Sequence, residues 1–350
     1  MDAPLQPLLS GWRSQLLADL NSTWGVAAAG RAFALAGLFE NLGESILVVV
    51  PGENDAEELV EDVRLFTDNV VFAPAWEILP FEHVSPNTLT MARRAEARHR
   101  LNGESPVLVV ASVRAAIQRL SPSPVEPLRM AKGDETDLGS LTATLADLGY
   151  QRTDRVEARG EFAVRGGIVD IFGAQAELPI RLDFWGDQLD ELREFSVASQ
   201  RSLESVADVV AYPAREVRPD EAMTQLARGL LTSDPWAAST WDRIAEGQMF
   251  AGIESWLPWL AEPSTLVDEL PPTAHFVLVD PVRALDRCRD LIKEEAELAA
   301  ALAPTWGESA PEAGDHPALF LDLSESVGDR PHLQMPPTPT GPADPVLNVT

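Results

Sequence analysis

The sequence is poor in the residues on which most covalent and metal chemistry depends. It contains one cysteine, Cys288, which excludes an intrachain disulfide and fits a reducing compartment. It contains two lysines, Lys132 and Lys293, so any reaction that needs a lysine amine has only two candidates. The five histidines lack partners at metal-ligand spacing, and we interpret them as surface or core residues: His83, His99, His275, His316 and His332. We therefore expect no metal site.

Long apolar runs are also absent. The longest, around residues 45–50, is the length of a strand and too short to span a bilayer. The chain starts with MDAPLQP, which lacks the basic and apolar pattern of a secretory leader. We expect a soluble, cytoplasmic protein with no membrane partner and no cofactor.

Positive charge is scarce as well. The chain has 55 acidic and 27 basic residues, a formal net charge of -28, so its surface should repel nucleic acid unless basic groups cluster. One cluster exists in residues 91–100, where Glu96 is interleaved with four arginines: Arg93, Arg94, Arg98 and Arg100. Two interpretations are open. The arginines form a phosphate-contacting face, or they form an ordinary solvated helix face.

Two kinds of segment alternate in the first part of the chain. Apolar runs of strand length fall at residues 46–50, 70–72 and 107–110, and helical periodicity follows at 55–66, 90–101 and 113–120. This order predicts a parallel α/β sheet. A further apolar run at 275–280, followed by a helical segment at 281–302, indicates that the same domain resumes late in the chain.

Between these two parts the pattern changes. Residues 152–217 contain short strands separated by glycine, aspartate and proline, with turn signals at 166–167, 173 and 186–187. A small α+β insert in a discontinuous α/β domain explains this pattern. We predict four segments: the first part of the α/β domain at 1–150, the insert at 151–218, the second part at 219–305, and a partly disordered linker and tail at 306–350.

A glycine-rich segment has nearly the spacing of a phosphate-binding loop. Gly25 and Gly30 have the required separation, but Arg31 and Ala32 stand where that loop has lysine and a magnesium-binding hydroxyl. The segment is either a degenerate phosphate loop or a helix start that is unrelated to nucleotide binding. Asp280 ends an apolar strand as a magnesium-binding aspartate would, but a turn or helix cap explains it better. We therefore expect no competent ATP site and no enzyme activity.

Three stretches resemble the UvrB family and its relative, the transcription-repair coupling factors (Mfd). Residues 74–86 read PAWEILPFEHVSP and match the family segment P-x-W-E-x-L-P-x-E/D-x-x-S-P. A second, more specific stretch lies within 149–202, and a third is AGIESWLP at 251–258. The matching blocks of the second stretch are 149–150, 154–157, 160–163, 165–172, 178–187 and 199–202. The resemblance covers most of the chain, from near residue 15 to near residue 305.

The altered phosphate loop favours the coupling factors, because UvrB keeps an intact loop and an aromatic DNA-inserting hairpin. The resemblance then implies a degenerate, helicase-like α/β domain carrying an insert like UvrB domain 2. It implies a non-catalytic adaptor that binds UvrA, with RNA polymerase and DNA bound only by later parts of an ATP-dependent translocase. The alternative is a fragment of an ATP-dependent helicase or translocase that binds damaged DNA, with ATP bound only in the intact protein.

The resemblance also indicates which residues contact UvrA. It assigns this role to Arg165, Arg181 and the aromatic Trp185, where relatives often carry phenylalanine. The neighbouring Asp183 and Phe184 are further candidates. Arginine and tryptophan are frequent interface hot spots.

Strand alternation predicts, without the resemblance, which of these candidate residues share a face. In 180–185 it places Arg181 and Asp183 on one face, with Leu182 and Phe184 on the other. Alternatives remain for each candidate. The two arginines neutralise carboxylates within the sheet (Asp170, Asp183 and Asp187), and Trp185 fills the core.

Overall fold

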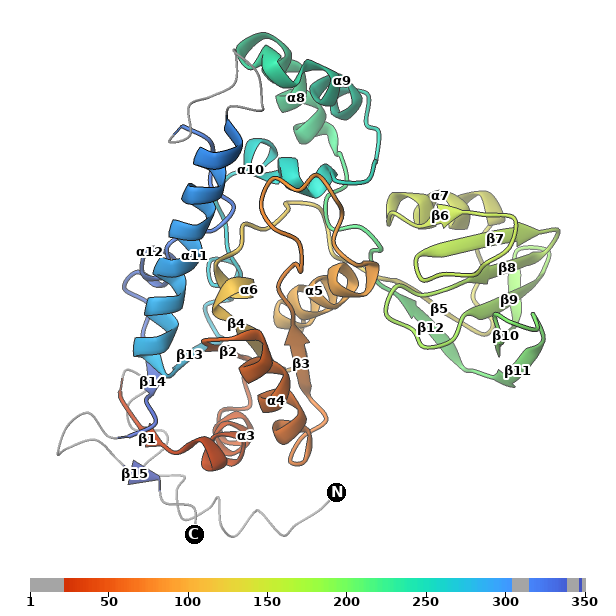
Figure 1. The fold of residues 1–350 in the computed structure, drawn as a ribbon. Coiled ribbons are helices and arrows are strands. Elements are labelled where there is room, and N and C mark those ends of the chain that lie inside the picture. The colour runs from red at the N-terminus through yellow and green to blue at the C-terminus, as the bar shows by residue number, and fades with distance from the viewer. Residues whose placement is uncertain (1–21, 304–314, 339–345, 348–350) are drawn as a thin grey trace.

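A five-stranded parallel sheet forms the centre of the larger domain (Figure 1). The computed structural model describes residues 22–303, 315–338 and 346–347. The strand order is β14 (His332–Met335), β13 (His275–Val279), β2 (Ile46–Val50), β4 (Leu108–Ser112) and β3 (Val70–Ala73). Their apolar sequences fit strands covered on both faces. The predicted parallel α/β domain is confirmed.

Helices cover both faces of this sheet. On one face, α3 (Arg31–Leu42) and α4 (Glu53–Arg64) pack against one set of alternating strand residues. On the other face, α5 (Thr88–Leu101), α6 (Val113–Ile117) and α11 (Pro281–Leu302) pack against the intervening set. Each strand therefore contributes to two separate hydrophobic cores.

A small helical region joins the insert to β13. It comprises α8 (Glu221–Ser233), the 3-10 turn η2 (Pro235–Ala237), α9 (Ala238–Ala245), the 3-10 turn η3 (Ile253–Trp256) and α10 (Leu257–Leu260). Four tryptophans pack together within it: Trp236, Trp241, Trp256 and Trp259. The ring centroids of Trp241 and Trp256 are 4.9 Å apart at 81°, an edge-to-face contact.

The end of the chain is more ordered than predicted. Residues 306–350 were expected to be linker and tail, but β14 pairs in parallel with β13, and α12 (Leu323–Val327) precedes it. A second strand, β15 (Val346–Leu347), pairs with β1 (Gly25–Val26). The prediction is wrong for residues 315–338 because their apolar side chains complete the sheet and its cores. Parts of that predicted tail, and of the helical spacing noted before residue 22, lie outside the described residues.

The insert is a separate unit beside the larger domain (Figure 1). Its main sheet has six strands, in the order β11 (Ser202–Ser205), β10 (Gln188–Phe195), β9 (Ile180–Trp185), β8 (Ile168–Ile171), β7 (Glu161–Arg165) and β6 (Gln151–Arg152). The turn between β7 and β8 requires glycine, because a Cβ at Gly167 would lie 2.9 Å from the Phe184 carbonyl oxygen.

The insert also begins earlier than the sequence suggested. A two-stranded ladder joins β5 (Leu128–Ala131) to β12 (Asp208–Ala211), and α7 (Leu138–Asp147) buries Leu141 and Leu145 in the core of the insert. The change in sequence pattern at residue 151 therefore lies inside the insert and does not mark its boundary. Residues 128–150 pack with the insert rather than with the parallel sheet, because their only ladder is with a strand that follows them by almost eighty residues.

Candidate functional site

One face of the insert carries the residues that the sequence singled out. In β9, Arg181, Asp183 and Trp185 alternate with the buried Leu182 and Phe184, as strand periodicity predicted. Antiparallel register pairs Arg181 with Asp170 of β8, and Asp183 with Ile168. Arg165 at the end of β7 is paired with Ile168. The strands thus bring Arg165, Arg181 and Trp185 to one side of the sheet.

Arg181 forms an internal ion pair. Its Nε and Nη2 donate to Oδ1 and Oδ2 of Asp170 at 2.7 and 2.8 Å, a bidentate arrangement. Asp170 is buried, and 20% of the Arg181 side chain is exposed. The hydrogen bonds that Arg181 donates to Asp170 raise the pKa of Arg181. The guanidinium carbon also lies 4.8 Å from the centroid of the Phe195 ring. Arg181 therefore neutralises a carboxylate within the sheet, which was the alternative role considered from the sequence. Only the outer part of its side chain is available to a partner.

Arg165 and Trp185 are much more accessible. Half of the Arg165 side chain is exposed, and its Nη2 lies 3.6 Å from Oδ2 of Asp170. Trp185 is 83% exposed at the hairpin between β9 and β10, where Gly186 adopts φ +64°. The suggestion that Trp185 fills the core is therefore wrong. An exposed tryptophan and two arginines on one face of a sheet are side chains of the types most often found as interface hot spots.

The other two candidates differ from each other. Asp183 is exposed on the same face, whereas Phe184 is 7% exposed and belongs to the core of the insert. Phe184 cannot contact a partner without leaving that core, because strand alternation turns it inward. We therefore leave Phe184 out of the binding face.

Sequence reasoning missed two residues of this face. Glu191 and Arg193 of β10 lie opposite Asp183 and Arg181, and the Arg193 guanidinium donates a hydrogen bond to the Glu191 carboxylate. That bond lowers the pKa of Glu191. The signal was alternation in residues 188–195, where Leu189, Leu192 and Phe195 are buried, although a register shift after Leu189 interrupts it.

The segment that resembles a phosphate loop lies at the start of α3. Gly25 is in β1, and Gly30 ends a 3-10 turn with φ −99° and ψ −9°. Arg31 follows with φ −62° and ψ −47°, so both residues are right-handed helical, without the left-handed step that makes an anion-binding nest. Burial lowers the pKa of Arg31, against the opposing effects of Asp280 and Asp55.

A salt-bridge cluster lies at the end of β13. Arg283 lies 3.4 Å from Asp280 and 3.3 Å from Asp55. Asp280 adopts φ +48° at the N-cap position of α11, without a side-chain capping hydrogen bond, and its carbonyl oxygen accepts from the Ala284 amide, so it begins the helix through its backbone. The carboxylate that would hold magnesium in a nucleotide site instead faces an arginine.

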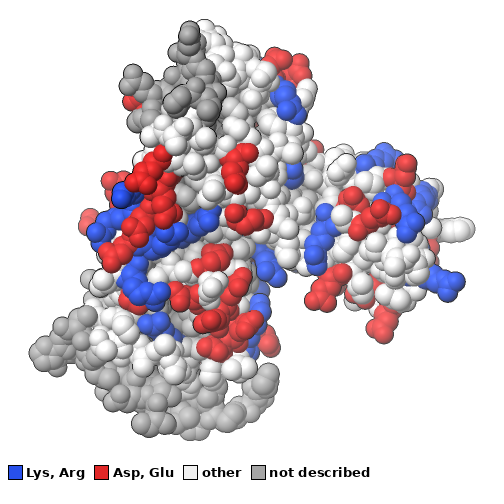
Figure 2. All heavy atoms as spheres, viewed as in Figure 1, with Lys and Arg blue, Asp and Glu red and all other residues white. Residues whose placement is uncertain are grey.

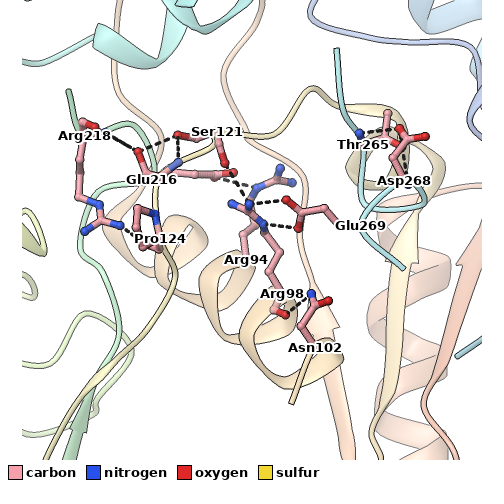
Figure 3. Close-up of polar contacts among 11 residues, drawn as sticks. Arg94, Arg98, Asn102, Ser121, Pro124, Glu216, Arg218, Thr265, Asp268 and Glu269 are labelled. Atoms are coloured by element: carbon pink, nitrogen blue, oxygen red, sulfur yellow. Dashed lines mark hydrogen bonds and ion pairs between the residues drawn. The ribbon is translucent and has the colours of Figure 1, made fainter. Parts of the chain in front are cut away.

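The four arginines of α5 do not form one surface. Arg94 and Arg98 are buried (Figure 3), where Arg94 pairs with Glu216 at 2.8 Å and Arg98 with Glu269 at 2.6 Å. Both sequence interpretations of the cluster were incomplete, because neither placed two of the arginines inside the fold. Only Arg93 and Arg100 remain for contacts at the surface.

The described residues also limit other kinds of site. Among them, no group of three histidine, cysteine or acidic residues is arranged to hold a metal ion. In the same part of the chain, no helix has the length and apolar character needed to cross a bilayer.

Comparison with known proteins agrees with this architecture. A family model described as the UvrB interaction domain matches residues 128–217, a range that begins at the first residue of β5 and ends six residues after β12. The transcription-repair-coupling factor of Mycobacterium bovis is 36% identical over 307 residues, which cover 81% of this chain and 25% of that protein. The Escherichia coli K12 protein of the same name is 31% identical over 68% of this chain and 22% of its own length.

A UvrB protein is similar over a comparable region. The UvrABC system protein B of Thermosipho africanus is 26% identical over 64% of this chain and 35% of its own length. This chain spans about a quarter of the length of the coupling factors that it matches. The chain belongs to the transcription-repair coupling factor family and corresponds to its N-terminal, UvrB-like region.

Proposed function

We propose that this chain is a non-catalytic adaptor that binds UvrA through the outer face of its insert. The observation that carries the proposal is the 83% exposure of Trp185 on the face of the sheet that also carries Arg165 and the outer part of Arg181. In the whole protein, this contact would recruit excision repair to stalled RNA polymerase. Polymerase and DNA would be bound by other parts of that longer protein.

The physical chemistry of this face favours a protein partner. A large apolar side chain in water gains free energy when a partner covers it, and arginine offers planar, bidentate hydrogen bonding to carboxylates. Asp170 already holds Arg181 in one orientation, which reduces the side-chain entropy lost on binding. Trp185 would be the anchor, with Arg165 and Arg181 giving specificity.

We expect Trp185→Ala to weaken UvrA binding by about 2 kcal/mol or more, roughly 30-fold in affinity, because an interface anchor is lost. Arg165→Ala should also weaken binding, by about 1–2 kcal/mol, because its partner group loses a charged donor. Isothermal titration calorimetry with purified UvrA measures both. The unfolding transitions should match that of the parent chain, since both side chains are largely exposed.

Leu226→Ala is the matched control, because Leu226 is an exposed apolar residue of α8, outside the insert. It should leave UvrA affinity unchanged. Arg181→Ala is less informative, since it leaves the buried Asp170 with only the distant Arg165. If Trp185→Ala and Arg165→Ala both bind UvrA as tightly as the parent chain, this face is not the binding site.

We also propose that the chain has no ATPase activity. Arg31 replaces the phosphate-binding lysine, and Arg283 lies within ion-pair distance of Asp55 and Asp280. Titration with Mg·ATP should therefore give no heat of binding, and hydrolysis should not exceed the background rate. Saturable binding that Arg31→Ala abolishes would instead support the ATP-dependent enzyme considered from the sequence.

A further inference from the structure

The last strand on one side of the central sheet lies at the bottom of a groove. β3 pairs with β4, has no second neighbour among the described strands, and has α4 above one face and α5 above the other. A cavity of about 340 Å³ runs along Val70, Val71 and Phe72. A second cavity, of about 540 Å³, shares Phe72 with it and continues past the end of β3.

The register shows which backbone groups face this groove. The Leu108 amide donates to the Asn69 carbonyl oxygen, so the parallel ladder uses the peptide groups of residues 69, 71 and 73. The N–H and C=O groups of the intervening residues, Val70 and Phe72, therefore point outward. The strand reads VVFA and contains none of the lysines or prolines that commonly block a free edge.

The two walls of the groove differ in charge. The α4 wall contributes Glu57 and Glu61, and the α5 wall contributes Arg93 and Arg100. Figure 2 shows acidic side chains gathered over α4 and basic side chains between α4 and the insert. Each wall also has one residue of the opposite sign, Arg64 on α4 and Glu96 on α5, so the α4 wall is net acidic and the α5 wall net basic.

We propose that this groove binds an extended segment of a partner protein, which adds to β3 as a sixth strand. Side chains of an added strand alternate between the two faces of the sheet. The segment that fits therefore alternates basic residues, which face Glu57 and Glu61, with acidic residues, which face Arg93 and Arg100. This site is separate from the UvrA-binding face proposed for the insert.

Charge disfavours two other occupants. A twofold pairing of two β3 edges would keep each helix layer on its own face, so Glu57 and Glu61 of two copies would meet. Nucleic acid would meet the same carboxylates on a chain of net charge -28.

The test uses two labelled peptides of equal composition and about eight residues, a common strand length. One alternates lysine and glutamate; the other has all its lysines before its glutamates. Fluorescence anisotropy with the whole chain should show that the alternating peptide binds and the block peptide does not. Val70→Pro should weaken binding about tenfold, because it removes one outward N–H and obstructs the edge.

Val70→Ala is the matched control, because it shortens the side chain but keeps the N–H, and it should retain the peptide affinity. We expect Val70→Pro to fold, because proline is tolerated at the first residue of an edge strand. UvrA affinity should be unchanged in both variants, because the groove is separate from the insert. If Val70→Pro does not fold, Glu57→Arg/Glu61→Arg decides: it should abolish binding of the alternating peptide.

Three results would overturn the proposal. The first is equal affinity for the two peptides. The second is unchanged peptide binding in a folded Val70→Pro variant, or in the charge-reversed variant. The third is failure of the peptide to bind, together with dimerisation in sedimentation or duplex-DNA binding that Val70→Pro removes. Loss of UvrA binding by Trp185→Ala bears only on the insert, so the two proposals can fail separately.

Discussion

Replacing Glu216 by alanine should lower the free energy of unfolding by about 3–5 kcal/mol, because it leaves a buried charge without its partner. The side chains of Arg94 and Glu216 are 4% and 2% exposed, and Arg94 Nε lies 2.8 Å from Glu216 Oε2. The same oxygen accepts a hydrogen bond of 2.7 Å from Trp76 Nε1. The substitution therefore removes the counterion of Arg94 and the acceptor of a buried indole together.

Urea denaturation followed by tryptophan fluorescence measures this change. Glu297→Ala is a suitable control, because Glu297 forms an exposed i,i+4 pair with Lys293 on α11 and should have no measurable effect. Arg94→Ala/Glu216→Ala should be less unstable than Glu216→Ala alone, since the double variant buries no unpaired charge. A loss below about 1 kcal/mol in Glu216→Ala would contradict the burial of this pair.

Arg215→Ala should destabilise the chain by a similar amount, about 3–5 kcal/mol near pH 8. Arg215 Nε lies 3.0 Å from Oε1 of Glu254, whose side chain is 0% exposed, and Ser85 Oγ donates to Oε2 at 2.7 Å. Without the guanidinium, the Glu254 carboxylate would stay buried but lose the ion pair that opposes the cost of its burial.

The loss should become smaller as the pH falls. Burial raises the pKa of Glu254 above its ordinary value of 4.5, with Arg215 opposing that rise, so removing Arg215 raises this pKa further. For a group whose folded pKa is raised, the stabilisation is fully present below the unfolded pKa and is lost as pH rises through the folded value. The parent and Arg215→Ala should thus differ most at pH 8 and least near pH 4.5.

Denaturation at several pH values tests this coupling. Arg215→Ala/Glu254→Gln provides the control, because glutamine does not ionise, and its stability relative to Glu254→Gln should vary little with pH. A constant gap between the parent and Arg215→Ala from pH 4.5 to pH 8 would show that Glu254 does not carry the effect.

These two ion pairs hold the same short segment. Arg215 and Glu216 lie just after β12, where the chain leaves the insert, and their partners lie in η3 and on α5 of the larger domain. The segment is therefore fastened to the body of the protein at two adjacent residues. Loss of either pair should weaken the fixed placement of the insert as well as the stability of the whole chain.

Much of the architecture followed from local sequence pattern. Apolar runs such as 46–50 and 275–279 are typical of strands covered on both faces, and the intervening helical periods place the covering helices. Alternation in 180–185 correctly separated Arg181 and Asp183 from Leu182 and Phe184. The family resemblance indicated UvrA as the partner and Arg165 and Trp185 as contact residues. Periodicity alone would not have connected these two residues with a binding site.

Other features depended on contacts between distant segments. The pairing of β5 with β12 and of β14 with β13 joins short strands across long stretches of chain, and four residues such as LRMA or HLQM carry too little periodic signal to reveal a partner. The insert boundary at residue 128 and the order of residues 315–338 could therefore not be predicted from local sequence pattern.

The sequence by itself determined a parallel α/β domain with a β-rich insert, and an insert strand whose charged residues face one way. Only the tertiary structure decided which arginines are free: Arg94 and Arg98 are buried by carboxylates more than a hundred residues away, while Arg165 remains half exposed. The physical reason is that strand and helix periods depend on neighbours in sequence, whereas burial and ion pairing depend on what the rest of the chain brings alongside.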